Sequence, residues 1–160
     1  MAAFWSTYTN KVDKKGRVSI PAAFRTHLIG PSFQGVVVFP AFRSSALECR
    51  SYEQMDRMTD AIDALPEFSP ERDALATALF GASVPLPFDT EGRIVLPKHL
   101  ADHAGITDEA AFLGKGNSFQ IWEPKALAKH MAEARDRVAL QGLSLPALHK
   151  PQTPQNGGAS

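Results

Sequence analysis

Two stretches of this sequence decide its fold, and they match each other at their turn residues: Asp13-Lys14-Lys15-Gly16-Arg17-Val18-Ser19-Ile20-Pro21 and Asp89-Thr90-Glu91-Gly92-Arg93-Ile94-Val95-Leu96-Pro97. They lie 76 positions apart, and aspartate, glycine, arginine and proline recur at the same places in both. Self-similarity at a fixed spacing indicates that one structural unit occurs twice. We therefore expect a doubled architecture in which each copy begins with the same turn.

Each stretch begins with a tight turn. Glycine adopts the left-handed backbone conformation without steric cost, and aspartate can accept hydrogen bonds from the backbone just ahead of it. Asp13 with Gly16, and Asp89 with Gly92, are therefore expected to shape and hold the two turns. The length of each turn suits a short hairpin loop.

A strand follows each turn. In the first copy Val18 and Ile20 alternate with Arg17, which predicts one buried face and an outward-pointing arginine. Pro21 then ends the strand and can begin a short helix, because proline suits the first helical position. Farther along, paired short apolar runs separated by turns, each pair followed by a helical stretch, predict a fold of the α+β class, mainly β.

The pattern divides the chain into five segments. We expect a first unit at residues 4–52, connecting helices at 53–82, a second unit at 83–128, a C-terminal helix at 129–142 and a structureless tail at 143–160. The tail is rich in proline, glycine and polar residues, a composition that buries too little apolar surface to fold.

Charge is distributed unevenly along the chain, although the formal net charge is zero. Residues 8–25 carry five basic residues against one acid, residues 84–100 carry two of each, and residues 51–73 carry seven acids against two arginines. A basic hairpin tip can contact phosphates and is narrow enough to enter the major groove of DNA. It can equally be a solvated surface turn, so charge alone leaves both interpretations open.

The basic residues of the first copy are the candidate DNA contacts. Arg17 can donate two parallel hydrogen bonds to guanine, whereas Lys14, Lys15, Lys11 and Arg25 are candidates for phosphate. So few charges on one chain give weak, salt-sensitive binding, and several copies in one assembly would add avidity. An active homo-oligomer is therefore expected.

Other functional classes have little support in the residues. Cys49 is the single cysteine, which excludes an internal disulfide and a multi-cysteine metal site. His99 and His103 lie four apart on an expected helix, but no third metal ligand accompanies them. No catalytic pattern is recognisable, so we expect no enzyme, no cofactor and no metal site. The apolar runs are too short for a membrane span or a signal peptide, and a cytoplasmic location is expected.

The sequence resembles the MraZ family, within the AbrB-like transcription factors. The resemblance rests on the doubled Asp-x-x-x-Arg turn at 13–17 and 89–93, and on the apolar-proline exits at 16–21 and 92–97. It also rests on the stretch Leu113-Gly114-Lys115-Gly116-Asn117-Ser118-Phe119-Gln120-Ile121-Trp122. It covers roughly residues 4–140, and two such turns at this spacing are far more specific than one.

The resemblance implies a fold, an assembly and a function. The implied fold is two tandem AbrB-like units that form a swapped-hairpin β-barrel within one chain, flanked by helices. The implied assembly is a ring-shaped homo-oligomer. The implied function is sequence-specific binding of double-stranded DNA at short repeated promoter sites, on the nucleoid. There the protein would repress a cell-division and cell-wall gene cluster and its own gene.

The resemblance also assigns roles to single residues. Carried over by position, the family's DNA-contacting arginine falls on Arg17, in the basic setting of Lys14 and Lys15. Arg93 takes the equivalent place in the second copy, where a threonine and a glutamate replace the two lysines. Arg93 can therefore contact DNA, or serve the fold or subunit contacts, and both interpretations remain open.

An alternative function stays open beside DNA binding. An oligomeric protein-interaction module, antitoxin-like or a scaffold without DNA specificity, would use the acidic 51–73 segment and the apolar helices. Retention of DNA at low salt distinguishes the two, because such a module would hold a protein partner instead.

Overall fold

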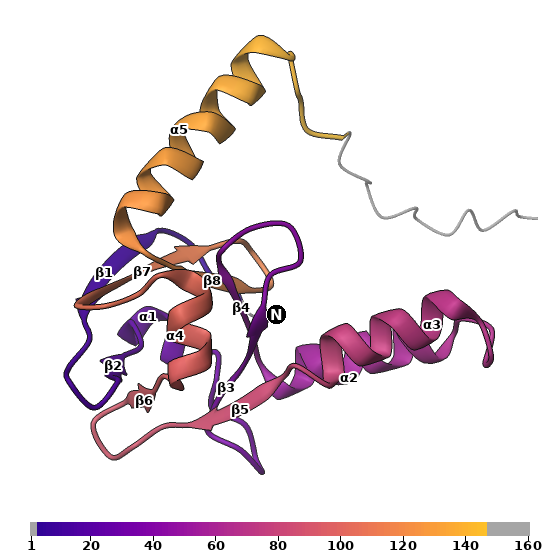
Figure 1. Cartoon of the computed structure of the whole chain (residues 1–160), viewed down its shortest axis with the longest axis horizontal. Helices are drawn as coiled ribbons and strands as arrows, with labels where there is room; N and C mark the ends of the chain where they lie inside the picture. Colours follow the sequence, from indigo (N-terminus) through magenta and orange to yellow (C-terminus); the bar gives the residue numbers. More distant parts are fainter. Residues whose placement is uncertain (1–2, 147–160) are drawn as a thin grey trace, which may run out of the picture. The chain divides into compact units, whose positions relative to one another are not determined.

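The computed structural model describes residues 3–146, and its architecture is α+β, as expected from the sequence (Figure 1). Its strands are β1 (Thr7–Lys11), β2 (Arg17–Ser19), β3 (Gly35–Pro40), β4 (Leu47–Arg50), β5 (Val84–Pro87), β6 (Arg93–Val95), β7 (Glu109–Gly114) and β8 (Phe119–Trp122). Its helices are α1 (Ala22–Arg25), α2 (Tyr52–Asp63), α3 (Pro70–Leu75), the π-helical continuation η1 (Ala76–Phe80), α4 (Lys98–Ala104) and α5 (Pro124–Leu140). Residues 147–160 of the expected tail lie outside the described part, and residues 143–146 form no helix or strand.

Strand pairing joins the two repeats. Six strands form one antiparallel sheet in the order β1-β7-β8-β4-β3-β5, and β2 and β6 form a separate two-stranded ribbon. Among the strand ladders of residues 3–146, only β3 with β4 and β7 with β8 pair within one repeat. The pairs β1–β7, β4–β8, β3–β5 and β2–β6 each join a strand of the first repeat to a strand of the second. The strand pairing of each repeat is therefore completed by the other.

The turn after β1 is a hairpin turn, but the strands it connects soon part. The Asp13 amide donates to the Arg17 carbonyl, the Gly16 amide donates to the Asp13 carbonyl, and Val12 bridges Val18. Beyond that bridge β1 pairs with β7, and β2 pairs with β6. The sheet stays open, because within residues 3–146 no ladder joins its edge strands β1 and β5 into a closed barrel.

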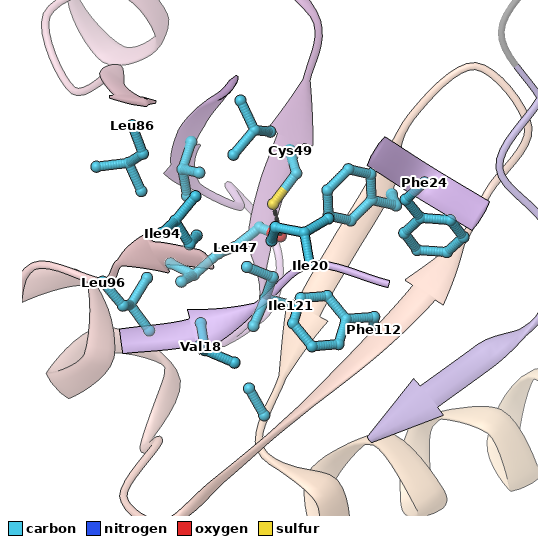
Figure 2. Packing of buried hydrophobic residues seen from close by; sticks show 14 of the residues in the cluster. Val18, Ile20, Phe24, Leu47, Cys49, Leu86, Ile94, Leu96, Phe112 and Ile121 are labelled. Atoms are coloured by element: carbon cyan, nitrogen blue, oxygen red, sulfur yellow. Dashed lines mark hydrogen bonds between the residues drawn. The ribbon is translucent and has the colours of Figure 1, made fainter. Parts of the chain in front are cut away.

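The apolar residues of the two repeated stretches meet in the main core (Figure 2). Val18, Ile20, Ile94 and Leu96 are each at most 4% exposed, as their alternation predicts. Other buried side chains of this core include Phe24, Leu47, Cys49, Leu86, Phe112 and Ile121. Full burial of one large apolar side chain contributes roughly 1.5–3 kcal/mol, so this shared core is a major source of stability for both repeats.

Helices α2 and α3, with the chain around them, form a helical hairpin at residues 51–81. The Ser51 hydroxyl accepts a hydrogen bond of 3.1 Å from the Gln54 amide and so caps the start of α2. Arg72 ties the two helices together through an ion pair of 3.0 Å with Asp63. The hairpin contacts the sheet through a small apolar cluster: Phe39, Ile62 and Leu79.

Helix α5 contains the boundary between two units of the chain. Among the described residues, those up to Ala128 belong to one compact unit, and those from Lys129 to residue 146 belong to a second one. Proline stands at the first position of α5, where its fixed φ suits a helix start. In the described part of the chain no helix is both long and apolar enough to cross a membrane.

Candidate nucleic-acid interface

The β2–β6 ribbon carries the arginines of both repeated turns. Val18 stands opposite Ile94 and both side chains are buried, so the alternation of a strand turns the remaining side chains outward. Two cross-strand pairs make up what we call the outer face of the ribbon: Arg17 opposite Val95, and Ser19 opposite Arg93. The fold thus brings Arg17 and Arg93 onto one surface, although 76 positions separate them in the sequence.

Asp13 organises the first turn, residues 13–17. Its Oδ1 atom accepts hydrogen bonds from the amides of Lys15 and Arg17, each 2.9 Å long. Its Oδ2 atom accepts a hydrogen bond of 2.6 Å from Nε of Arg17. One carboxylate therefore fixes both the backbone of the turn and the direction of the arginine side chain.

Asp89 organises the second turn, residues 89–93, with the same set of contacts. Its Oδ1 atom accepts hydrogen bonds from the amides of Glu91 and Arg93, each 2.9 Å long. Its Oδ2 atom accepts a hydrogen bond of 2.8 Å from Nε of Arg93. The repetition in the sequence therefore corresponds to a repetition of individual hydrogen bonds.

These hydrogen bonds favour the ionised aspartates and lower the pKa of both below the ordinary value of 3.8. The largest cause in each turn is the hydrogen bond from the amide of the arginine. The arginine side chain and the amide of residue 15 or 91 add to it, and desolvation opposes it. In the second turn the hydrogen bond to Asp89 also raises the pKa of Arg93. Both carboxylates are therefore charged at neutral pH.

Each turn is held by the other repeat. Gly16 and Gly92 have φ values of +82° and +75°, in the left-handed region that glycine adopts most readily. The Leu96 amide donates a hydrogen bond of 2.8 Å to the Gly16 carbonyl. The Ile20 amide donates one of 3.2 Å to the Gly92 carbonyl. The ribbon therefore links the two turns as well as the two strands.

The two turns differ in the charge around their arginines. Lys14 and Lys15 are exposed, and neither forms an ion pair within residues 3–146. Arg17 uses only its Nε atom in the turn, so its terminal nitrogens have no hydrogen-bond partner in the described part of the chain. Arg93, by contrast, directs a terminal nitrogen to Glu91 at 3.2 Å. The first turn presents donors to an external anion, whereas the second is partly neutralised from within.

Arg25, an expected phosphate contact, is half-buried against the second turn. Its Nη1 atom donates to the Ile20 carbonyl. A Cβ atom on Gly92 would lie 2.7 Å from Nε of Arg25, so the guanidinium packs directly on that glycine. These contacts give Arg25 a role in the fold, and its contact with phosphate stays a prediction.

Lys11, another expected phosphate contact, is exposed at the end of β1 and stands opposite Glu109. It borders an open cleft of about 490 Å³ whose other charged residues are three acids, Asp108, Glu109 and Glu123, and one base, Lys125. These carboxylates offset the positive charge of Lys11. An approaching anion is therefore attracted less strongly here than at the first turn.

Sequence reasoning missed two residues of the outer face, Ser19 and Val95. The signal was present, because each lies two positions after a repeated arginine and so shares its face of the strand. Val95 is 55% exposed, although valine is among the residues that proteins most often bury.

The histidine pair considered as a metal site lies away from any further ligands. His99 and His103 are both exposed on α4. Across residues 3–146 no three or more histidine, cysteine, aspartate or glutamate side chains are grouped so that they could hold a metal ion.

Comparison with known proteins finds relatives along nearly the whole chain. A family model described as "MraZ protein, putative antitoxin-like" matches residues 79–139. A protein of Pelagibacter ubique named Transcriptional regulator MraZ is 44% identical over 142 residues, which cover 89% of this chain and 92% of that relative. Proteins of the same name from Methylocella silvestris and Rickettsia rickettsii are 44% and 41% identical over 149 residues. Those residues cover 93% of this chain and 91% and 100% of the two relatives.

Proposed function

The chain belongs to the MraZ family, and on that premise we propose that it binds DNA sequence-specifically through its β2–β6 ribbon. The relatives are named as transcriptional regulators, so the role of this chain is regulation of transcription. The family is one of regulators and not of enzymes. What the proposal adds is the surface that contacts DNA and the residues that distinguish one sequence from another.

The difference between the two turns carries the proposal. Both turns have the same hydrogen bonds, but only the first presents an arginine with unused terminal nitrogens beside two exposed lysines. Contacts within the fold do not account for that difference, because the two lysine side chains and the terminal nitrogens of Arg17 make no hydrogen bond or ion pair within residues 3–146. Such a set of donors suits DNA, which offers guanine edges and phosphates within a few ångströms of each other.

A two-stranded ribbon also has the right shape for this task. The major groove of B-DNA, about 12 Å wide, admits such a ribbon, and several regulators read bases with one. Arg17 then donates both terminal nitrogens to a guanine, while Lys14 and Lys15 bind the phosphates beside it. Asp13 supports the arginine from behind, because its carboxylate fixes Nε and leaves the terminal nitrogens to the base.

The remaining candidate residues take supporting roles in this proposal. Arg93 contacts DNA more weakly than Arg17, since Glu91 competes for it. Lys11 and Arg25 provide peripheral attraction for phosphates. The turns themselves are held by a set of four residues: Asp13, Gly16, Asp89 and Gly92.

We also propose an assembly and a target on the basis of the family. The two repeats are tandem AbrB-like units, and the ribbon completes a swapped-hairpin barrel by packing beside the open sheet. The exchange of strand partners between the repeats supports this arrangement. Several chains form a ring, because one basic turn per chain binds weakly and repeated copies add avidity. The ring acts on the nucleoid in the cytoplasm and represses a cell-division and cell-wall gene cluster and its own gene at repeated promoter sites.

The test is a binding titration with DNA that the wild-type protein selects from a random pool. Arg17→Ala should weaken binding about ten- to a hundredfold, the value of one two-bond contact with guanine. Arg57→Ala serves as the control, because it removes an exposed arginine from α2 that is paired with Glu53. The control should leave the affinity unchanged.

Two outcomes would count against the proposal. Selection of no sequence, together with capture of a stable protein partner at low salt, would favour the protein-interaction module. Equal losses of affinity in the two arginine variants would mean that overall charge, and not the ribbon, governs binding. Thermal unfolding of both variants checks that any loss of binding is not a loss of fold.

A further inference from the structure

Val95 is the one apolar side chain on the outer face of the ribbon. It is 55% exposed, and it stands directly opposite Arg17 across the two strands. The other cross-strand pair of that face is made of polar residues, Ser19 and Arg93. Phosphates offer no apolar surface, so contact with them does not use the Val95 side chain.

The ladder pattern places Val95 very close to Arg17. The Leu96 amide donates to the Gly16 carbonyl, and the Ile20 amide donates to the Gly92 carbonyl. Hydrogen-bonded and non-hydrogen-bonded positions alternate along an antiparallel pair, so Arg17 and Val95 form a non-hydrogen-bonded pair. The Cα atoms of such a pair are about 4.5 Å apart, and their side chains stand side by side.

That separation is similar in size to the spacing of bases in DNA. Successive base pairs are stacked about 3.4 Å apart along the helix axis. If the Arg17 guanidinium reaches a guanine, the Val95 methyl groups lie over the same base step. The Asp13 carboxylate keeps the arginine directed outward, so the two side chains approach the groove together.

Only one base offers an apolar group in the major groove, namely thymine through its C5-methyl. We therefore infer that Val95 recognises the methyl group of a thymine next to the guanine bound by Arg17. This inference rests on the proposed function and adds a second base to it. Because Val95 belongs to the second repeat, that repeat contributes to base recognition beside the first turn, through a methyl contact and not chiefly through its own arginine.

Ser19, the residue of the first repeat that corresponds to Val95, supports the assignment of Val95 to thymine recognition. The repeat places Ser19 where the second copy has Val95. Ser19 stands opposite Arg93, at the end of the ribbon whose arginine Glu91 engages. Val95 thus stands beside Arg17, whose terminal nitrogens are unused. Ser19 stands beside the other arginine, which Glu91 partly neutralises.

The experiment removes single methyl groups from the DNA. Each thymine of the site selected by the wild-type protein is replaced in turn by uracil, which pairs identically but lacks the C5-methyl. At one position beside a guanine, wild-type binding should weaken roughly fourfold, the equivalent of exposing one buried methyl. Val95→Ala should bind the thymine and uracil sites with equal affinity. Arg57→Ala, a change on α2 and outside the ribbon, should still prefer thymine fourfold.

The outcomes separate this inference from the proposed function. If the wild-type protein binds the site but no uracil substitution changes its affinity, Val95 does not recognise thymine although DNA binding stands. The same conclusion follows if Val95→Ala keeps the wild-type preference for thymine. If the wild-type protein selects no DNA, both proposals fail. Should Val95→Ala bind too weakly to measure, Val95→Thr replaces one methyl by a hydroxyl at constant shape and should reduce the preference.

Discussion

The Leu96 amide donates a hydrogen bond of 2.8 Å to the Gly16 carbonyl, so a strand of the second repeat holds the turn of the first. The approach is close enough that a Cβ atom on Gly16 would lie 2.8 Å from the Leu96 carbonyl oxygen. The Leu96 carbonyl belongs to the backbone of β6's continuation, so it cannot move away from an added Cβ atom without loosening the ribbon. Gly16 is therefore a position at which the two repeats are joined.

Gly16→Ala is expected to lower the free energy of unfolding more than Gly116→Ala does. Both glycines have positive φ values, +82° and +87°, so both substitutions carry a conformational cost of about 1–2 kcal/mol. A Cβ atom on Gly116 would meet nothing within 4 Å, whereas the one on Gly16 meets Leu96. Urea unfolding measures the two losses. Equal losses would show that the contact with Leu96 adds nothing to the cost.

Arg25→Ala is expected to destabilise the fold by about 1–2 kcal/mol, because it removes a charged donor from the Ile20 carbonyl and a packing partner from Gly92. Arg43→Ala, a change at an exposed arginine between β3 and β4, should have little effect. Thermal unfolding gives the comparison. Unchanged stability of Arg25→Ala combined with a weaker salt dependence of DNA binding would make Arg25 a phosphate contact instead.

Local features of the fold were predictable from the residues, since each depends on neighbours in the chain. The burial of Val18 and Ile20 follows from their alternation, and the start of α2 follows from Ser51. The pairing of β2 with β6 does not follow, because two strands of three residues carry too little pattern to specify a partner. From the residues alone, the hairpin turn indicates pairing of neighbouring strands.

In the candidate site, too, local features were predictable from the sequence and contacts between the repeats were not. Arg17 could be placed outward from its strand position, and the Asp13 contact follows from the turn chemistry of aspartate. The placement of Arg25 on Gly92 could not be foreseen, because it depends on a turn far along the chain. Val95 was overlooked for a similar reason: its importance comes from Arg17, which faces it only after the repeats have exchanged strands.

Asp13 and Asp89 are expected to titrate below pH 3.8, since hydrogen bonds from the turn favour their ionised forms. The folded pKa lies below the unfolded one, so each carboxylate stabilises the fold above the unfolded pKa and loses this effect as the pH falls through the folded pKa. Carboxyl resonances followed by NMR during acidification give both midpoints. Midpoints at or above 3.8 would contradict the hydrogen bonds described for the turns.

The Arg17→Ala variant gives that titration an internal control. Removal of the side chain takes away one of the hydrogen bonds to Asp13 but keeps those from the amides of Lys15 and residue 17. The pKa of Asp13 should therefore rise only part of the way to its ordinary value. Asp89, whose contacts are untouched, should titrate as in the wild-type protein.

Glu91→Lys is expected to strengthen DNA binding and to steepen its dependence on salt. Glu91 holds a terminal nitrogen of Arg93 at 3.2 Å, so its loss leaves that nitrogen for DNA. The introduced lysine also makes the second turn resemble the first in charge. Each added phosphate contact changes the slope of log K against log salt concentration by about 0.9. Fluorescence anisotropy at several salt concentrations measures the slope.

A variant with the same change of charge elsewhere on the chain shows whether the effect of Glu91→Lys on DNA binding depends on its position in the second turn. Glu53→Lys introduces the same two-unit change on α2, where Glu53 pairs with Arg57 at 2.9 Å. Long-range attraction alone would make the two variants equal at low salt, because both chains then carry the same net charge. A contact at the ribbon predicts that the Glu91 variant keeps its advantage at physiological salt, where charges more than about 8 Å from the DNA are screened. Equal affinities at that salt concentration would remove the second turn from the DNA interface.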